Sequence, residues 1–374
     1  MKHFKYLFIL LPVVILNSLL LGAGPEGVRP IKEDRPISDL TRQLLETYTG
    51  DRKYSEVCWL TAHNAFANDR KGWSYSQQNL DFDEQYDLGV RSFMVDLYLF
   101  QPQDDVNEEG KTVTPEPFVA MCHEPGFLGG QNCLTTRLML KNGEPEPFLN
   151  ILLQIKEWLK QDPETIITLQ VESRFGEDGA KEALTHVLQE AKLMDYLYIP
   201  QVEPEEINDW PTLEQMRESN RRLVVFSDNP NDGFIHTSTY RETRFDLGRF
   251  SRCEMRDDDR DTNKMMPLFV LNHFHSLSIR LNGFWRDYES VNSYKSIMER
   301  VGLCETEHNM LPNFLVLDFT EEGSCGGALQ AVSDINLQPK DRFTHDLTHN
   351  PLNEEDLLIY DIEAIEVAVG HAMV

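Results

Sequence analysis

The chain has 374 residues, of which 41% are hydrophobic, so it can bury the core of one large domain or two smaller ones. Its formal net charge of −27 argues against nucleic-acid binding, because such binding depends on Lys and Arg neutralising phosphates. The same charge argues against electrostatic attachment to an anionic membrane surface, and it is typical of a soluble monomer.

The N-terminal segment has the layout of a secretory signal peptide. Lys2 and Lys5 precede an apolar run of 18 residues, Tyr6–Ala23, which ends at small residues. An uncleaved membrane anchor is the alternative, because this run is just long enough to span a bilayer. The protein is therefore expected to be secreted or periplasmic. We predict a signal peptide over 1–23, a Pro-rich linker over 24–37 and a folded domain over 38–374 that ends in a helical tail.

Six cysteines follow the signal segment, at positions 58, 122, 133, 253, 304 and 325. An oxidising compartment favours disulfides between them, and six cysteines allow about 15 pairings that the sequence cannot distinguish. Cys122 and Cys133 flank a Gly-rich loop that a disulfide could close. The chain has no CxxC spacing, which argues against a zinc site or a redox motif.

Seven short apolar runs alternate with longer amphipathic or loop segments. The runs are CWLTAH, RSFMVDLYLF, PFVAMCH, TIITLQVES, RLVVFSD, LFVLNHF and NFLVLDF. Helical patterns lie at about 38–48, in FLNILLQIKEWLKQ and in GAKEALTHVLQEAKLM. The alternation of strand and helix predicts a parallel sheet with crossover helices. Runs that are almost wholly apolar predict strands that are buried on both faces.

Each of these runs carries a polar side chain in or just after its C-terminal half. These side chains are His63-Asn64, Asp96, His123, Glu172, Ser227-Asp228, Asn272-His273 and Asp318. In a (β/α) barrel the carboxyl ends of the strands converge on one mouth, which carries the active site. A doubly wound open sheet would also bring such ends together, but no GxGxxG or GxxxxGK[ST] motif follows the first run. The sequence therefore predicts an α/β fold of the TIM-barrel type.

The residues at these ends suit phosphodiester chemistry. Two imidazoles, His63 and His123, could act as general base and general acid, because one can be neutral while the other is charged. The oxygen atoms of Asn64, Asp96 and Glu172 form the kind of cluster that Ca²⁺ prefers. Such an ion would stabilise charge that develops on a phosphoryl group.

The motifs around these residues resemble the phosphatidylinositol-specific phospholipase C X-domain superfamily, and in particular its extracellular PLC-like phosphodiesterases. WLTAHNAF resembles the first-histidine motif, QYDLGVRSFMVDLYLF the G-x-R strand and MCHEPG the second-histidine motif. ETIITLQVES resembles the strand that carries the last acidic metal ligand. DWPTLEQMRESNRRLVVFSD, and PNFLVLDF followed by GGALQAVSDIN, resemble the PLC-like subgroup.

The resemblance implies a distorted barrel and a role for each matching position. His63 would be the general base that takes a proton from the attacking hydroxyl, and His123 the general acid that protonates the leaving alkoxide. Asp318 would orient one of the two imidazoles. The implied ligands of Ca²⁺ are Asn64, Asp96 and Glu172.

Arg174 and Asp228 are assigned to substrate binding, because an arginine can bind a phosphate with two parallel hydrogen bonds. The alternative for Arg174 is that it serves as an internal counter-ion. In the same way, Asp96 and Glu172 could form ion pairs with Arg91 and Arg174 instead of binding a metal, since structural ion pairs also occur in clefts.

Met94 departs from the pattern of the metal-dependent members, which carry a further acidic ligand two residues before Asp96. A missing carboxylate lowers the expected affinity, so Ca²⁺ is expected to bind weakly.

The predicted activity is that of a hydrolase of lipid metabolism, a phosphoric diester hydrolase that acts on a phospholipid or another phosphodiester and contacts membrane surfaces transiently. One alternative is a glycerophosphodiester or sphingomyelin-type phosphodiesterase on the same barrel, against which Met94 and Asn64 argue. Another is a catalytically inactive barrel that binds a lipid or a protein.

Overall fold

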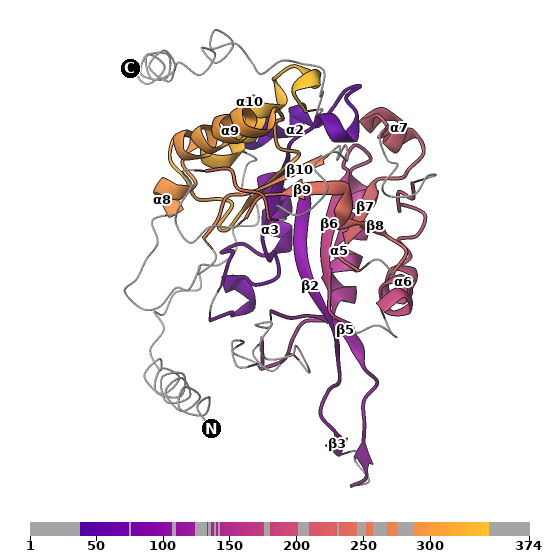
Figure 1. Cartoon of the computed structure of the whole chain (residues 1–374). Helices are drawn as coiled ribbons and strands as arrows, with labels where there is room; N and C mark the ends of the chain where they lie inside the picture. Colours follow the sequence, from indigo (N-terminus) through magenta and orange to yellow (C-terminus); the bar gives the residue numbers. More distant parts are fainter. Residues whose placement is uncertain are drawn as a thin grey trace, which may run out of the picture. The chain divides into compact units, whose positions relative to one another are not determined.

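A computed structural model describes most of the predicted folded domain (Figure 1). The described residues are 38–74, 76–106, 110–123, 133, 136–137, 140, 143–175, 180–200, 209–229, 232–244, 252–256, 268–275 and 288–343. The predicted signal peptide, the linker and the C-terminal tail lie outside these residues. No helix within them is both long enough and apolar enough to cross a membrane.

Within the described residues, the main sheet has nine strands, eight of which follow one another in parallel ladders. These eight are β1 (Trp59–Ala62), β2 (Ser92–Phe100), β6 (Ile167–Ser173), β7 (Leu223–Ser227), β8 (Ile235–His236), β9 (Tyr240–Glu242), β10 (Leu268–Asn272) and β11 (Phe314–Leu317). Their spatial order is β8-β7-β6-β2-β1-β11-β10-β9, so β1 pairs directly with β11.

This strand order is that of a barrel. Neighbouring strands follow the chain order from β1 through β2, β6 and β7 to β8. They follow it again from β9 through β10 and β11 back to β1. The described residues contain no ladder between β8 and β9, but only Thr237–Thr239 separates these two strands in the chain. The prediction of an α/β, TIM-type but distorted barrel is therefore confirmed, with the distortion at the β8–β9 seam.

The strands form the core of the barrel. Almost all their residues are buried, and in β1, β7, β10 and β11 every residue is buried. Aromatic rings fill the end of the barrel where the strands begin. The ring of Tyr54 lies 5.4 Å from that of Trp59, 4.7 Å from that of Trp210 and 6.3 Å from that of Phe314. This packing leaves the opposite, carboxyl ends of the strands to carry polar groups.

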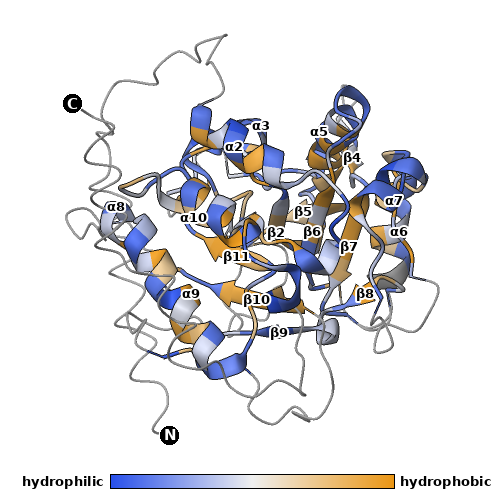
Figure 2. Ribbon diagram, turned by 90° about the horizontal axis from the view of Figure 1, so that it is seen from above, coloured by the Kyte–Doolittle hydropathy of each residue, from blue (hydrophilic) through white to orange (hydrophobic). Residues whose placement is uncertain are grey.

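Helices surround the strands, as the view from above shows (Figure 2). They are α2 (Asp39–Thr47), α3 (Phe82–Leu88), α5 (Phe148–Gln161), α6 (Ala180–Glu190), α7 (Leu213–Glu218), α8 (Tyr288–Val291), α9 (Tyr294–His308) and α10 (Gly327–Asn336). The three predicted helices are confirmed as α2, α5 and α6. Helix α5 buries Ile151, Ile155 and Leu159, which recur at intervals of four residues and so share one face.

The third apolar run, PFVAMCH, is a strand but does not belong to the barrel. It forms β5 (Phe118–Met121), which pairs antiparallel with the outer half of β2, from Leu97↔Met121 to Phe100↔Phe118. Strand β2 has nine residues and extends beyond the barrel, where Figure 1 shows β5 beside it and a short hairpin further out. That hairpin consists of β3 (Asp105–Val106) and β4 (Thr112–Val113).

Two of the strands that complete the barrel were missed by the sequence prediction. Strands β8 and β9 have two and three residues, which is too short for a recognisable apolar pattern.

Two disulfides occur among the described residues, Cys122–Cys133 and Cys253–Cys304. The first closes the Gly-rich loop after β5, as the sequence allowed. Cys58 is free and buried, and Cys325 is free and exposed.

Candidate active site

His63 and Asp318 lie side by side at the carboxyl ends of β1 and β11. Ala62 pairs in register with Leu317, so the next residue of each strand reaches the same level of the barrel mouth. Nδ1 of His63 is 2.7 Å from Oδ1 of Asp318, whose side chain is completely buried. The hydroxyl of Tyr288 donates to the other carboxylate oxygen at 3.3 Å. A carboxylate in this position fixes the orientation of the imidazole and the tautomer that carries a proton on Nδ1.

The imidazole of His63 is also held on its face and through its backbone. The ring of Phe274 stacks on it with 3.8 Å between centroids and an interplanar angle of 13°. Nε2 of Gln78 donates to the carbonyl oxygen of His63 at 2.8 Å and to that of Leu317 at 3.0 Å. The described residues provide no hydrogen-bond partner for Nε2 of His63, so this nitrogen is available to a substrate.

A residue with positive φ follows each member of this pair. Asn64 has φ 41°, a conformation that asparagine tolerates, whereas Phe319 has φ 51°, which is strained for a bulky residue. The strained turn is held by Nδ2 of Asn292, which donates to the carbonyl oxygens of Asp318 at 2.8 Å and Phe319 at 3.0 Å. Backbone strain held at this point keeps the buried carboxylate in place beside His63.

His123 has a carboxylate partner of its own. Nδ1 of His123 is 3.0 Å from Oδ2 of Asp96, and 3.3 Å from Nδ2 of Asn64. The backbone nitrogen of His123 donates to Oγ1 of Thr136 at 2.7 Å, directly after the disulfide-bonded Cys122. Its side chain is 43% exposed, against 16% for His63. The two histidines therefore present one sheltered and one open imidazole at the same mouth.

The residues assigned to substrate binding form an ion-pair chain with Glu172. Nη2 of Arg174 is 2.5 Å from Oε2 of Glu172, and its Nη1 is 2.6 Å from Oδ2 of Asp228. Oδ1 of Asp228 accepts from the backbone nitrogen of Ser173 at 2.7 Å. Both oxygens of Asp228 and both terminal nitrogens of Arg174 are thus engaged by the protein itself. This geometry favours the interpretation of Arg174 as an internal counter-ion.

Asp96 and Glu172 are neighbours across β2 and β6, because they pair in register. Burial, and after it the Asp96 carboxylate, raises the pKa of Glu172 to about 7. Arg91, the alternative partner of Asp96, instead donates through Nη1 to the carbonyl oxygens of Tyr86 and Val90, before β2 begins.

Asn64, Asp96 and Glu172 are the residues at this mouth that could hold a divalent cation. Asp96 and Glu172 pair in register, and Nδ2 of Asn64 lies against the same ring nitrogen of His123 that contacts Asp96. Three oxygen-bearing side chains are few, since Ca²⁺ takes about six to eight oxygen ligands. Among the described residues, no group of three or more His, Cys, Asp or Glu could hold a metal ion, and Met94 adds no carboxylate to β2.

The sequence did not identify Gln77, which joins the two halves of the site. Its Oε1 accepts from Nδ2 of Asn64 at 2.7 Å, and its Nε2 is 3.4 Å from Nδ1 of His63. Phe274 was missed as well. Gln77 occurs in a segment without a distinctive pattern, and Phe274 ends the apolar run LFVLNHF but has no polar group to draw notice, so only their positions in the fold identify them.

His273, near the end of the sixth apolar run, is part of the buried structure and not of the mouth. Its side chain is completely buried, and its Nε2 lies 2.8 Å from the carbonyl oxygen of Val291. Burial lowers the pKa of His273 to about 4, so the ring is neutral near pH 7.

Solved structures similar to this chain include phosphatidylinositol-specific phospholipases C of two bacteria. The protein from Staphylococcus aureus is 12% identical with a TM-score of 0.47, and the match covers 80% of this chain and 99% of that one. The protein from Listeria monocytogenes is 12% identical with a TM-score of 0.47, over 79% of this chain and 97% of that one.

Relatives also occur among known proteins. A PI-PLC X domain-containing protein of Arabidopsis thaliana is 25% identical over 300 residues, which are 76% of this chain and 62% of that protein. An uncharacterized secreted protein of Arthroderma benhamiae is 25% identical over 345 residues, or 86% of this chain and 70% of that protein. The chain thus spans less than two thirds of the length of the Arabidopsis relative.

The family model described as PI-PLC X matches residues 49–336, a range that includes both histidines, their carboxylate partners and all the strands of the barrel. This match extends over more than half of the chain and agrees with the resemblance of the motifs. The chain belongs to the PI-PLC X family.

Proposed function

We propose that this protein is a phosphoric diester hydrolase of the phospholipase C type, with His63 as general base and His123 as general acid. The observation that supports this proposal is the pair of imidazoles at one barrel mouth, each with Nδ1 against its own carboxylate. These contacts are 2.7 Å for His63–Asp318 and 3.0 Å for His123–Asp96. Such contacts direct the Nε2 nitrogens to proton transfer, which is the geometry that general acid–base catalysis requires.

In the proposed reaction, Nε2 of His63 takes the proton of the attacking hydroxyl group while its oxygen forms a bond to phosphorus. The bond between phosphorus and the leaving oxygen breaks, and protonated His123 gives its proton to that oxygen. A hydroxyl on the substrate itself would yield a cyclic phosphate and a free alcohol. Asp318 and Tyr288 keep the base in its tautomer, and Phe274 keeps the ring in its plane.

Asn64, Asp96 and Glu172 are the residues that would hold Ca²⁺ in this proposal. When bound, the cation would offset the negative charge that develops on the phosphoryl oxygens. Asp96 would then serve both His123 and the cation, so loss of this carboxylate affects both.

The proposed substrate is a phospholipid head group or a related phosphodiester, and the protein would act outside the cell. The support is the match to the PI-PLC X family, together with a relative that is described as a secreted protein. With a formal net charge of −27, contact with a lipid surface would be transient and would not rely on attraction to anionic lipids.

The test is turnover of a panel of phosphodiesters, including phosphatidylinositol, with added Ca²⁺ and with a chelator. The wild-type protein is compared with His63→Ala and with His186→Ala, since His186 is an exposed residue of α6 outside the mouth. Wild type and His186→Ala are expected to cleave at least one member of the panel, and His63→Ala to lose about 10²- to 10⁴-fold in rate. Equal rates for His63→Ala and wild type would refute the proposal.

A further inference from the structure

Gln77 lies between the two histidines but takes no part in the proton transfers described above. Its Oε1 accepts from Nδ2 of Asn64 at 2.7 Å, and its Nε2 lies 3.4 Å from Nδ1 of His63. Nδ2 of Asn64 in turn lies 3.3 Å from Nδ1 of His123. Two side-chain amides in contact therefore separate the proposed base from the proposed acid.

Of the two contacts of the Gln77 amide, the contact with Asn64 is the stronger. A separation of 2.7 Å is normal for a hydrogen bond, whereas 3.4 Å is beyond the usual range. Nδ1 of His63 also directs its proton to Asp318 at 2.7 Å, so Nε2 of Gln77, a donor, faces a nitrogen that donates elsewhere. Gln77 therefore acts on Asn64 and not on the base.

The bond between Asn64 and Gln77 fixes which end of the Asn64 amide faces His123. Because Nδ2 donates to Oε1 of Gln77, the NH₂ group and not Oδ1 lies against the imidazole. Within the described residues, Oδ1 of Asn64 accepts no hydrogen bond. It keeps contact with solvent, although the residue is only 3% exposed. The amide thus presents a donor to His123 and leaves its acceptor open.

This orientation decides which group accepts the proton on Nδ1 of His123. Oδ2 of Asp96 lies 3.0 Å from Nδ1 and can accept this proton, whereas the NH₂ group of Asn64 cannot. In a reversed amide, Oδ1 of Asn64 would lie against Nδ1 and compete with Asp96. The imidazole would then have two alternative acceptors, and Nε2 would lose its fixed direction. His123 depends on such a restraint, since its side chain is 43% exposed.

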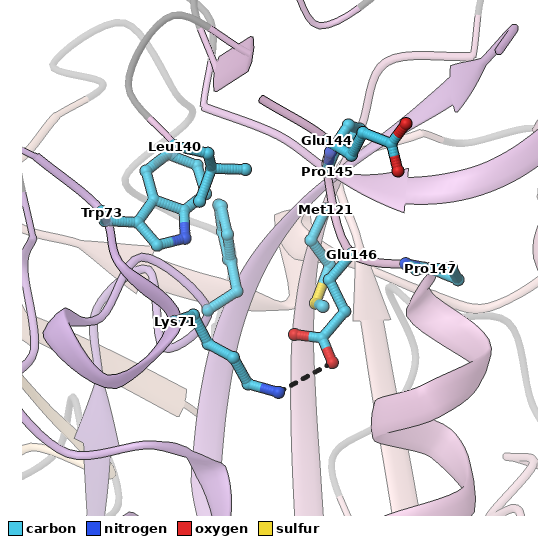
Figure 3. Close-up of a pocket in the computed structure, with 9 residues that line it drawn as sticks. Lys71, Trp73, Met121, Leu140, Glu144, Pro145, Glu146 and Pro147 are labelled. Carbon is cyan, nitrogen blue, oxygen red and sulfur yellow. Dashed lines mark hydrogen bonds and ion pairs between the residues drawn. The ribbon is translucent and has the colours of Figure 1, made fainter. Parts of the chain in front are cut away.

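The loop that carries Gln77 is held in place by bonds that do not involve the Gln77 side chain. The backbone nitrogen of Gln77 donates to the carbonyl oxygen of Ala67 at 2.7 Å, and its carbonyl oxygen accepts from the backbone nitrogen of Phe319 at 2.9 Å. Elsewhere in the loop, Nζ of Lys71 lies 3.0 Å from Oε1 of Glu146, a pair that Figure 3 shows. A substitution of Gln77 therefore tests its amide and not the path of the loop.

We propose that Gln77 is a positioning residue for the general acid, His123. It orients the amide of Asn64, and the amide in this orientation leaves Asp96 as the acceptor at Nδ1. The inference rests on the proposed function, because its effect on catalysis requires His123 to be the general acid. The orientation of the imidazole, in contrast, is a property of the protein without substrate and can be measured separately.

The kinetic test uses Gln77→Met, which keeps the length of the side chain but has no amide. On an alkyl phosphodiester this variant is expected to lose about 10- to 100-fold in kcat with little change in KM, as expected for a misplaced acid. On a nitrophenyl phosphodiester, whose leaving group needs no proton, the loss should be far smaller. Equal losses on both substrates would overturn the positioning role. Gln189→Met is the matched control, at an exposed position of α6.

A double-mutant cycle tests whether Gln77 acts through Asn64. Asn64→Gly is the second variant, because glycine tolerates the positive φ of this position. The double variant is expected to lose no more kcat than Asn64→Gly alone, since the amide that Gln77 orients is already absent. Losses that add in the double variant would overturn the inference.

Nitrogen NMR resonances of the His123 imidazole separate this inference from the proposed function, because they are recorded without substrate. Gln77→Met and Asn64→Gly are each expected to shift the Nδ1 resonance, and Gln189→Met to leave it unchanged. Such shifts support the positioning role even if wild type cleaves no phosphodiester, an outcome that would overturn only the catalytic proposal. An unshifted resonance in Gln77→Met, with folding established by circular dichroism, overturns the positioning role alone.

Discussion

Nδ1 of His63 lies 2.7 Å from Oδ1 of Asp318, although 255 positions separate the two residues in the chain. The β1–β11 ladder, which joins the first and last strands of the barrel, brings them together. Asp318→Asn keeps the shape of the side chain. With its amide oxygen accepting from the hydroxyl of Tyr288, its NH₂ group, a donor, faces Nδ1 of His63, so the catalytic tautomer is no longer favoured. We expect kcat to fall by about 10²- to 10⁴-fold with little change in KM.

The control for this variant is Asp334→Asn. Oδ2 of Asp334 accepts from the hydroxyl of Tyr294 at 2.9 Å in the helical layer, away from the mouth. Its kcat should equal that of wild type. A kcat of Asp318→Asn within threefold of wild type would show that the carboxylate does not position the base.

The assignment of His123 as general acid predicts a dependence on the leaving group. An alkoxide needs a proton as it departs, whereas a nitrophenolate is stable without one. His123→Ala should therefore lose about 10²- to 10⁴-fold on an alkyl phosphodiester and far less on a nitrophenyl phosphodiester. His63→Ala should lose activity on both substrates alike. The measurement is the steady-state rate of each variant on the two substrates. Equal losses of rate for His123→Ala on both substrates would contradict its role as general acid.

Met94 precedes Asp96 by two residues on β2, so the two side chains share one face of the strand. Met94→Glu would add a third carboxylate to the proposed cation ligands and is expected to tighten Ca²⁺ binding about tenfold from a starting Kd of about 10⁻⁴ to 10⁻³ M. Calorimetric titration with Ca²⁺ measures this without reference to activity. The control is Leu337→Glu, because Leu337 is 69% exposed and its substitution does not disturb the core, as a change at buried Met216 would. Unchanged affinity in Met94→Glu would argue against a cation at this place.

His273 predicts a pH dependence of stability. Burial lowers its pKa in the folded protein to about 4, below the ordinary 6.5, and Arg300 and His275 nearby lower it further. The unfolded chain therefore binds more protons between these pH values. The stability that neutral His273 contributes is complete above about pH 6.5 and is lost as the pH falls towards 4. The loss amounts to about 3 kcal/mol.

The measurement is the free energy of unfolding by urea at several pH values between 4 and 7. His273→Gln keeps a donor for the carbonyl oxygen of Val291 but cannot titrate, so its stability should vary less with pH than that of wild type. His186→Gln, on the exposed face of α6, should leave the pH dependence unchanged. An identical slope in His273→Gln and wild type would contradict the prediction.

The barrel was predictable because its long strands and helices carry strong local patterns, such as the four-residue spacing of Ile151, Ile155 and Leu159 in α5. The direction of β5 was not predictable. An apolar run such as FVAM has the same appearance in a parallel and an antiparallel ladder, and only its return along β2 shows which it is. For β8 and β9 the patterns are too short to detect.

In the candidate site, too, local patterns identified some residues, whereas contacts between distant segments were not predictable. The residues at the strand ends were identifiable, since chemistry at a barrel mouth draws on them. Their partners were harder to predict, because a contact such as His123–Asp96 depends on where β5 ends relative to β2. For this reason the sequence assigned Asp96 to a cation, with Arg91 as the alternative partner, and not to His123. Gln77 and Phe274 reach His63 from loops whose paths no local pattern specifies.

Strand β5 lies outside the ring of eight parallel strands, and their ladders form without it. The two histidines are therefore encoded in separable parts of the chain: His63 belongs to the closing ladder of the barrel, and His123 to an appendage on β2. An evolving lineage could lengthen, exchange or discard that appendage, and alter how the leaving group receives its proton, while the scaffold that supports the base persisted unchanged.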